Sequence, residues 1–159
     1  MPQVKTSPGR SRIMKALMAK PKGERKVEFD PAIDRLRAIC LALPETTEKM
    51  AWGEPTFRVR GKLFAQLDNH HHGADHLAVW LPMPLGAQEG LVYVDPVRYF
   101  VPPYVGGRGW VGVRIDRRPN WKAIADLVRE AYCTVAPLRL SAPLRSAPAA
   151  GKQGLRRAR

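Results

Sequence analysis

Three basic side chains lie close together in a segment that has the pattern of a β-hairpin. Arg58 and Arg60 alternate with apolar residues, and Gly61-Lys62 follows as a two-residue loop with glycine first, as a type II′ turn requires. The alternation places Arg58 and Arg60 on one face of a strand. A basic ribbon of this kind can contact phosphates or enter a nucleic-acid groove. The alternative is a solvated sheet face that is kept soluble by its charge, and such faces are the more common arrangement.

A glycine-rich turn further along the chain is a candidate for anion binding. Gly106, Gly107 and Gly109 surround Arg108. Glycine lets backbone amides approach a phosphate, which an arginine can then clamp. Three more arginines follow at Arg114, Arg117 and Arg118. No Gly-Lys-Ser/Thr sequence is present, so the turn is not a P-loop. The alternative is a structural turn ahead of a strand, which is the usual role of an isolated glycine-rich turn.

Aromatic residues gather in the same part of the chain. If they are exposed, they can stack on bases or line a ligand pocket. If they are buried, they form the core, which is the more frequent outcome at strand and helix spacing. The possible pocket consists of Trp52, Phe57, Tyr104 and Trp110, with Tyr99 and Phe100 nearby.

No arrangement of side chains indicates a catalytic reaction. Cys40 lies on the apolar face of a predicted helix and Cys133 in another, and neither has a histidine partner close in sequence. Glu45, Glu48 and Glu54 follow the first helix, but their spacing does not identify a general acid and base. We therefore identify no catalytic residues and favour a non-enzymatic protein.

A run of histidines raises the question of a metal site. Residues 70–72 are all histidine, and Asp75 and His76 follow closely. Three consecutive histidines cannot all reach one ion from a regular strand, and a zinc site needs fixed ligands with a supporting second shell. We interpret this segment as a polar loop and expect no metal and no cofactor.

Apolar periodicity predicts the elements that position these residues. A helix is expected to start at Asp30-Pro31 and end at Pro44, and the last helix to start at Asn120 and end at Pro137. Strands are expected at residues 56–60, 63–67, 76–81 and 110–115, with one or two short helices between 85 and 100, the second opened by Asp95-Pro96. Strands flanked by helices favour an α+β fold, a two-layer sandwich with an antiparallel β-sheet packed by N- and C-terminal helices.

Positive charge is concentrated at the two ends of the chain. The net charge is +13; residues 1–28 and residues 137–159 contribute +6 each, and residues 29–136 only +1. We therefore expect a basic disordered tail at 1–28, a folded domain at 29–140, and a basic tail rich in Ala, Pro and Arg at 141–159, also disordered. Basic tails attract polyanions whatever the domain does, so they predict a non-specific contribution to DNA binding.

The middle of the chain resembles the MmcQ/YjbR family of small bacterial proteins. The resemblance rests on LRAICLALPETTE (36–48), WGEPTFRVRGKLFAQL (52–67), YFVPPYVGGRGWVGVRID (99–116) and IADLVREAYCTVAPLRL (124–140). It implies an α+β sandwich of the frataxin-like, double-wing type and a protein described as DNA-binding-like. It brings no catalytic residues to this chain.

Charge, hairpin and resemblance together favour a non-enzymatic DNA-binding or nucleic-acid-associated protein. The expected nucleic-acid-binding residues are Arg58, Arg60, Lys62, Arg108 and Arg114. The alternative is a domain that binds a small ligand or a protein partner through the aromatic surface around Trp52, Tyr104 and Trp110. The sequence contains no secretory signal and no apolar stretch of transmembrane length, so we expect a cytoplasmic monomer that makes no membrane contact.

Overall fold

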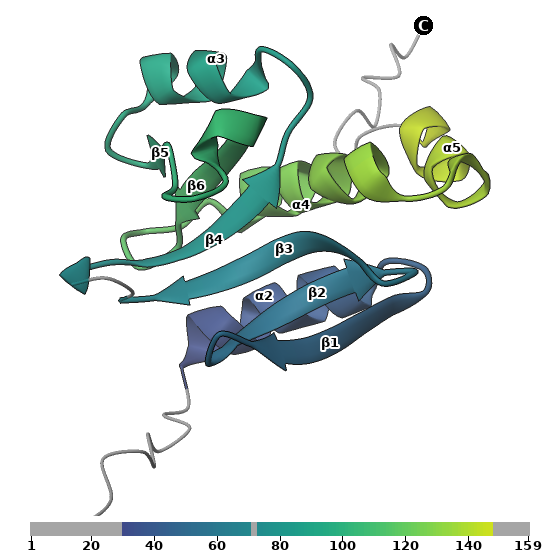
Figure 1. Ribbon diagram of the computed structural model, residues 1–159, viewed down its shortest axis with the longest axis horizontal. Coiled ribbons are helices and arrows are strands. Elements are labelled where there is room, and N and C mark those ends of the chain that lie inside the picture. The colour runs from purple at the N-terminus through teal and green to yellow at the C-terminus, as the bar shows by residue number, and fades with distance from the viewer. Residues whose placement is uncertain (1–29, 71–72, 148–159) are drawn as a thin grey trace, which may run out of the picture.

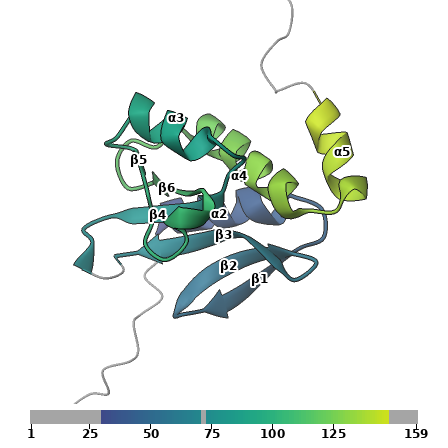
Figure 2. The ribbon, with the colours of Figure 1, turned by 45° about the horizontal axis from the view of Figure 1, so that its top comes forward.

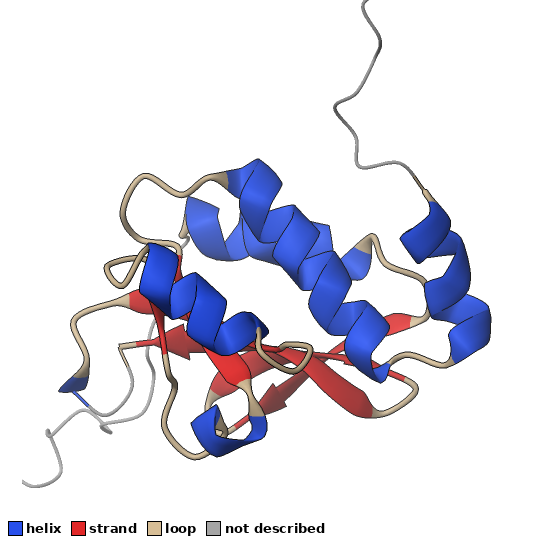
Figure 3. Cartoon of the chain, turned by 90° about the horizontal axis from the view of Figure 1, so that it is seen from above, coloured by secondary structure: helices blue, strands red, loops and turns tan. Residues whose placement is uncertain are grey.

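The chain forms an antiparallel β-sheet with its long helices on one side (Figures 1 and 3). The computed structural model describes residues 30–70 and 73–147. The strands are β1 (Thr46–Ala51), β2 (Glu54–Val59), β3 (Lys62–Asn69), β4 (Leu77–Pro82), β5 (Tyr99–Phe100) and β6 (Trp110–Arg114), in the sheet order β1-β2-β3-β4-β6-β5. The helices are α2 (Pro31–Leu41), α3 (Ala87–Val94), the 3₁₀ turn η2 (Gly106–Arg108), α4 (Trp121–Val135) and α5 (Leu138–Ser146). The predicted α+β fold with an antiparallel sheet is confirmed.

The two predicted helix starts are also confirmed. Asp30 Oδ1 accepts a hydrogen bond from the Ala32 amide at 2.8 Å, and Pro31 occupies the first helical position, where no amide donor is needed. Asn120 Oδ1 accepts from the Ala123 amide at 3.1 Å and starts α4. Helices α2 and α4 each bury one face against the sheet.

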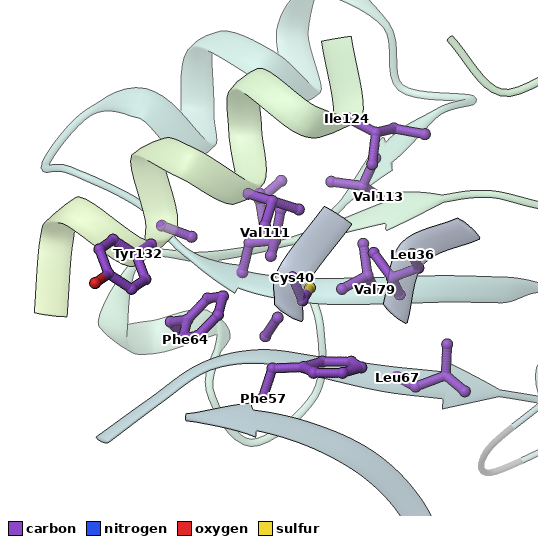
Figure 4. Packing of buried hydrophobic residues seen from close by; sticks show 14 of the residues in the cluster. Leu36, Cys40, Phe57, Phe64, Leu67, Val79, Val111, Val113, Ile124 and Tyr132 are labelled. Atoms are coloured by element: carbon purple, nitrogen blue, oxygen red, sulfur yellow. The ribbon is translucent and has the colours of Figure 1, made fainter. Parts of the chain in front are cut away.

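The main core lies between the sheet and the pair α2 and α4 (Figure 4). Tyr132 connects the layers: its ring packs edge-on against Phe64 with 5.3 Å between centroids, and its hydroxyl donates to the Pro44 carbonyl at 2.7 Å. The other large buried side chains come from both layers: Leu36, Cys40, Phe57, Leu67, Val79, Val111, Val113 and Ile124.

A second, smaller apolar cluster lies on the opposite face of the sheet. Trp80, Val105 and Trp110 are buried there, with Leu63 and Phe100 packed against them. The segment between α3 and β6 crosses this face and supplies the cover, and η2 is the helical turn seen on that side in Figure 3. The Phe100 ring occupies the space that a Cβ atom on Gly112 would need, so glycine is required where β5 meets β6. This cover leaves the same face of β1 and β2 without a helix.

The hairpin turn differs from its prediction by one residue. The loop is Arg60-Gly61, because Val59 pairs directly with Lys62. Arg60 has φ 52° and Gly61 φ 79°. Positive φ at both positions defines a type I′ turn, whose twist matches that of the flanking strands. Lys62 is therefore the first residue of β3 and not part of the loop.

The secondary structure departs from the expectations at further places. Strand β1 was not predicted, and it pairs with β2 along its whole length through the turn Trp52-Gly53. Of the one or two short helices expected between 85 and 100, one is present, α3, and the residues Asp95-Pro96 form a turn that leads into β5. Helix α5 occupies residues 138–146, which extends past residue 140 into the stretch expected to be disordered.

Helix α5 packs onto α4, so the folded part of the chain continues to residue 147. Ser141 is buried, and Arg145 Nη2 donates to the Cys133 carbonyl at 2.8 Å. The tail expected at 1–28 lies outside the described residues, as does the part of the tail expected at 141–159 that follows residue 147. No helix between residues 30 and 147, in the parts that are described, is long and apolar enough to cross a membrane.

Candidate nucleic-acid interface

Strands β1 and β2 and the turn that follows them carry several cations. Lys49 on β1 and Arg58 on β2 point away from α2, because their pairing partners alternate with those of the core residue Phe57. Arg60 and Lys62 are exposed at the β2–β3 turn. Figure 2 shows β1 and β2 at the edge of the sheet, on the side of β3 away from β4. Lys49 was not part of the sequence prediction, because β1 itself was missed.

The turn fixes the side chain of Arg58. Its Nη1 lies 3.4 Å from the Gly61 carbonyl, and its Nε is buried and finds no hydrogen-bond acceptor within the described part of the chain. A buried donor without an acceptor is costly to stability. Arg60 has a partner, since its Nη1 lies 3.5 Å from Glu45 Oε2.

Arg108 lies at the same end of the sheet as the hairpin turn. Trp110 on β6 pairs with Pro82 on β4. Continuing the register of β3 and β4 places Pro82 opposite Phe64, which is two residues after Lys62. Trp110 is therefore level with the start of β3. The Arg108 guanidinium lies 6.0 Å from the centroid of the Trp110 ring, which is the outer limit of a cation–π contact. The exposed ring of Tyr104 belongs to the same crossing segment. We refer to Lys49, Arg58, Arg60, Lys62 and Arg108 as the hairpin surface.

The glycine-rich turn does not form a cradle of free amides for an anion. The amides of Gly106, Arg108 and Gly109 donate to carbonyls of the same turn at 3.0 to 3.1 Å. Gly106 is needed because a Cβ atom would collide with Val101, and Gly109 because its φ is 81°. Gly106 and Gly109 therefore have structural roles, in line with the alternative interpretation, and Arg108 is a side chain of the turn that remains available to a ligand.

Arg114 is separated from the other predicted contact residues. It pairs with Ala78, which pairs with Asp68 on β3. Asp68 is six residues from Lys62, which is ~20 Å along a strand at ~3.3 Å per residue. Arg114 also binds Asp116, with Nη2 3.0 Å from Oδ2. The structure thus brings four of the five predicted residues to one end of the sheet and places Arg114 at the other.

The ion pair between Arg114 and Asp116 perturbs both groups. The hydrogen bond to Asp116 is the main cause that raises the pKa of Arg114. Burial raises the pKa of Asp116, but the hydrogen bond from Arg114, a backbone hydrogen bond and the charges of Arg114 and Arg117 together outweigh burial, so the pKa of Asp116 lies below its usual value. Arg114 is therefore held in a fixed position by a carboxylate.

The four aromatics of the predicted pocket do not share a cavity. Phe57 lies in the main core, and Trp110 lies in the small cluster on the opposite face of the sheet. Trp52 is 69% exposed in the β1–β2 turn, at the end of the sheet away from Trp110, and Tyr104 is 80% exposed. Of these four side chains, only Trp52 and Tyr104 are exposed enough to contact a partner.

A buried polar group that the sequence did not reveal lies between the strands. Asp68 is 3% exposed, and its Oδ2 accepts from Trp80 Nε1 at 3.0 Å and lies 2.9 Å from His76 Nε2. The His76 ring packs against Phe100 at 4.7 Å between centroids. His76 thus has a structural role beside the small cluster. No group of three or more His, Cys, Asp or Glu side chains with metal-binding geometry occurs among residues 30–70 and 73–147.

The cysteines lack the environment of nucleophiles. Cys40 is fully buried in the main core, and burial raises the pKa of its thiol well above the usual value. Burial also raises the pKa of the Cys133 thiol. Thiols of this kind are predominantly protonated at neutral pH and react slowly.

This fold and these segments define a chain of the YjbR class. The YjbR family model matches residues 41–134, which is more than half of the sequence, and the chain belongs to that family. A solved structure, that of Deinococcus radiodurans protein DR2400 with a domain of the same family under the name DUF419, has a similar fold with a TM-score of 0.58. It is 20% identical, and the alignment covers 77% of this chain and 93% of that one. No curated protein matches the chain.

Proposed function

We propose that this chain is a non-enzymatic nucleic-acid-binding protein that contacts duplex DNA through the hairpin surface. The observation that carries the proposal is the convergence of Arg58, Arg60, Lys62 and Arg108 at one end of the sheet. Cations on a two-stranded ribbon reach phosphates on either side of a groove. The basic segments outside residues 30–147 add sequence-independent affinity, because every neutralised phosphate releases counterions.

The alternative is a partner-binding domain that uses the exposed aromatics. Trp52 and Tyr104 support it, since both large side chains are mostly exposed at turns. Phe57 and Trp110 lie in different clusters on opposite faces of the sheet, so the four aromatic residues enclose no common pocket, and the proposal of a small aromatic ligand has less support than that of DNA. Tyr104 also fits the first proposal, because it is close in sequence to Arg108 and can stack on an exposed base.

The test is duplex binding measured by fluorescence anisotropy across a salt series. Lys62→Ala and Arg108→Ala are expected to weaken binding and to lower the slope of log affinity against log salt by about 0.9 each. Lys122→Ala is the matched control, because Lys122 is an exposed cation on α4, in the helical layer. Equal effects of Lys62→Ala and Lys122→Ala would show that only net charge matters and would reject the hairpin surface.

A fragment separates the domain from the tails. It should span residues 30–147, because ending at 140 would cut through α5 and expose the packing around Ser141. The proposal requires that this fragment keeps measurable duplex affinity with a slope that depends on Lys62. If affinity disappears with the tails while the fragment remains folded by circular dichroism, the domain does not bind DNA.

A further inference from the structure

Three arginines from separate segments line a small cavity at the opposite end of the sheet. Arg98 precedes β5, Arg114 ends β6, and Arg117 follows in the loop that leads to α4. Asp95 and Val97 complete the lining. We refer to these five residues as the arginine pocket. None of its residues belongs to the hairpin surface.

The backbone holds two of these arginines in place. The Arg114 amide donates to the Arg98 carbonyl at 2.9 Å, which joins the turn before β5 to the end of β6. The Arg114 guanidinium is fixed by two hydrogen bonds to Asp116, at 3.0 and 3.2 Å. Arginine side chains held in advance lose little conformational freedom when they bind a ligand, which favours affinity.

Carboxylates oppose two of the three arginines. Asp95 is engaged with its own turn: its Oδ1 accepts from the Arg98 amide at 3.0 Å, and its Oδ2 lies 3.6 Å from Arg98 Nε. Asp116 is engaged with Arg114, and Asp75 is close enough for its charge to raise the pKa of Arg114. Arg117 is exposed beside the cavity. Arg117 is therefore the cation of the pocket that an anion can pair with.

The cavity is large enough for an anion. It has a volume of about 70 Å³, whereas one ordered water needs roughly 10 to 15 Å³. This space can hold a single tetrahedral oxyanion. Arginine forks match the oxygens of phosphate in geometry and charge.

We propose that the arginine pocket binds one phosphate group, either inorganic phosphate or the terminal phosphate of a small monoester. Arg117 supplies the principal charge, Arg114 is the fixed donor, and Arg98 closes the side next to β5. This site is independent of the DNA proposal, because its residues lie ~20 Å along the strands from Lys62.

Residue-resolved NMR of the full chain tests the site with two probes, inorganic phosphate and glycerol phosphate, at constant ionic strength. Saturable shifts are expected for the backbone amides of Arg98, Arg114 and Arg117. Arg117→Ala should weaken binding at least fivefold, and Arg117→Lys by less. A higher affinity for glycerol phosphate than for inorganic phosphate would identify a monoester as the source of the bound phosphate group. Equal affinities would identify free phosphate.

The control is Arg118→Asn, which removes the adjacent cation outside the pocket. Arg118 has φ 43°, and asparagine tolerates that conformation. The proposal fails if Arg118→Asn weakens binding as much as Arg117→Ala, or if the shifts do not saturate. The proposal also fails under a combination of two results. The first is that Arg117→Ala weakens duplex binding as much as Lys62→Ala does, and the second is that neither phosphate probe shifts the amides of the pocket. Loss of DNA binding by Lys62→Ala with phosphate binding intact would confirm that the two sites are separate.

Discussion

Arg139 Nη2 donates to both carboxylate oxygens of Glu45, at 3.0 and 3.1 Å, across 94 positions of sequence. The same carboxylate lies 3.5 Å from Arg60 in the hairpin turn. Glu45 therefore stands between two arginines, one from α5 and one from the proposed DNA-contacting surface. It lowers the positive charge of the hairpin surface at one corner.

Glu45→Gln is expected to tighten duplex binding, because it frees Arg60 and Arg139 to contact phosphates. The salt slope should increase by about 0.9 for each new contact. Anisotropy titrations of the two full-length proteins at equal salt provide the measurement. Glu130→Gln is the control, since Glu130 pairs with Arg145 on the helical layer. Unchanged or weaker binding by Glu45→Gln would argue against the hairpin surface.

Tyr132→Phe should lower the free energy of unfolding by about 1 to 2 kcal/mol. The substitution keeps the edge-on packing with Phe64 but removes the donor to the Pro44 carbonyl, and a lost hydrogen bond at a partly buried acceptor costs about that much. Urea denaturation followed by circular dichroism measures the difference. Tyr132→Ala should cost more, about 3 to 5 kcal/mol, because it also leaves a cavity. Equal losses for the two variants would mean that the ring adds nothing.

Gly112→Ala should destabilise the domain by about 1 to 3 kcal/mol through overpacking. Its new methyl group would occupy the position of the Phe100 ring. Gly107→Ala is the matched control, because nothing lies within 4 Å of its Cβ position. The same denaturation experiment compares them. The effect of Gly112→Ala is then measured in a protein that also carries Phe100→Ala. If Gly112→Ala no longer lowers stability in that background, the clash with the Phe100 ring is the cause.

The Arg114–Asp116 pair should make stability depend on pH in the acid range. The folded pKa of Asp116 lies below its ordinary value of 3.8. A lowered folded pKa stabilises the fold above the unfolded value, and this contribution is lost as pH falls through the folded pKa. Asp116→Asn should be less stable than the parent protein at pH 7, and the difference should shrink below about pH 3.8. A difference that stays constant between pH 7 and pH 2 would contradict this assignment.

The sequence predicted the buried elements well and the edge elements poorly. The buried residues Val111 and Val113 recur at the period of a strand. Helix α4 buries one face at the period of a helix, and its capping residue Asn120 marks where it starts. Strand β1 reads TTEKMA and is mostly exposed. An edge strand of this kind buries little apolar surface and leaves no period to detect. The only local signal was the pair Trp52-Gly53, which forms a turn with positive φ at both residues.

The errors at the hairpin turn and at α5 have different physical causes. Non-glycine residues rarely adopt positive φ, so the sequence favoured glycine in the first turn position, whereas Arg60 occupies it. Helix α5 contains Pro143 within an Ala, Pro and Arg composition that is typical of disorder. Helix α5 forms because it packs against α4, and a local sequence pattern does not indicate such long-range packing.

The site was only partly predictable for a similar reason. Hairpin residues are neighbours in sequence, so Arg58, Arg60 and Lys62 were placed together correctly on the hairpin. The separation of Arg114 and its convergence with Arg98 and Arg117 depend on the strand order β4-β6-β5. Strand order is a property of the whole fold, and short-range spacing does not determine it.

That strand order also affects how the chain reaches its native state. Strands β1, β2 and β3 each pair with the next strand in sequence, the first two through two-residue turns, so this meander needs only short loop closures. The pairing of β4 with β6 closes a loop over residues 83–109 and costs more chain entropy. Contacts of high sequence separation slow folding. We infer that docking of β6 is the late step, so the arginine pocket, which requires it, assembles after the hairpin surface.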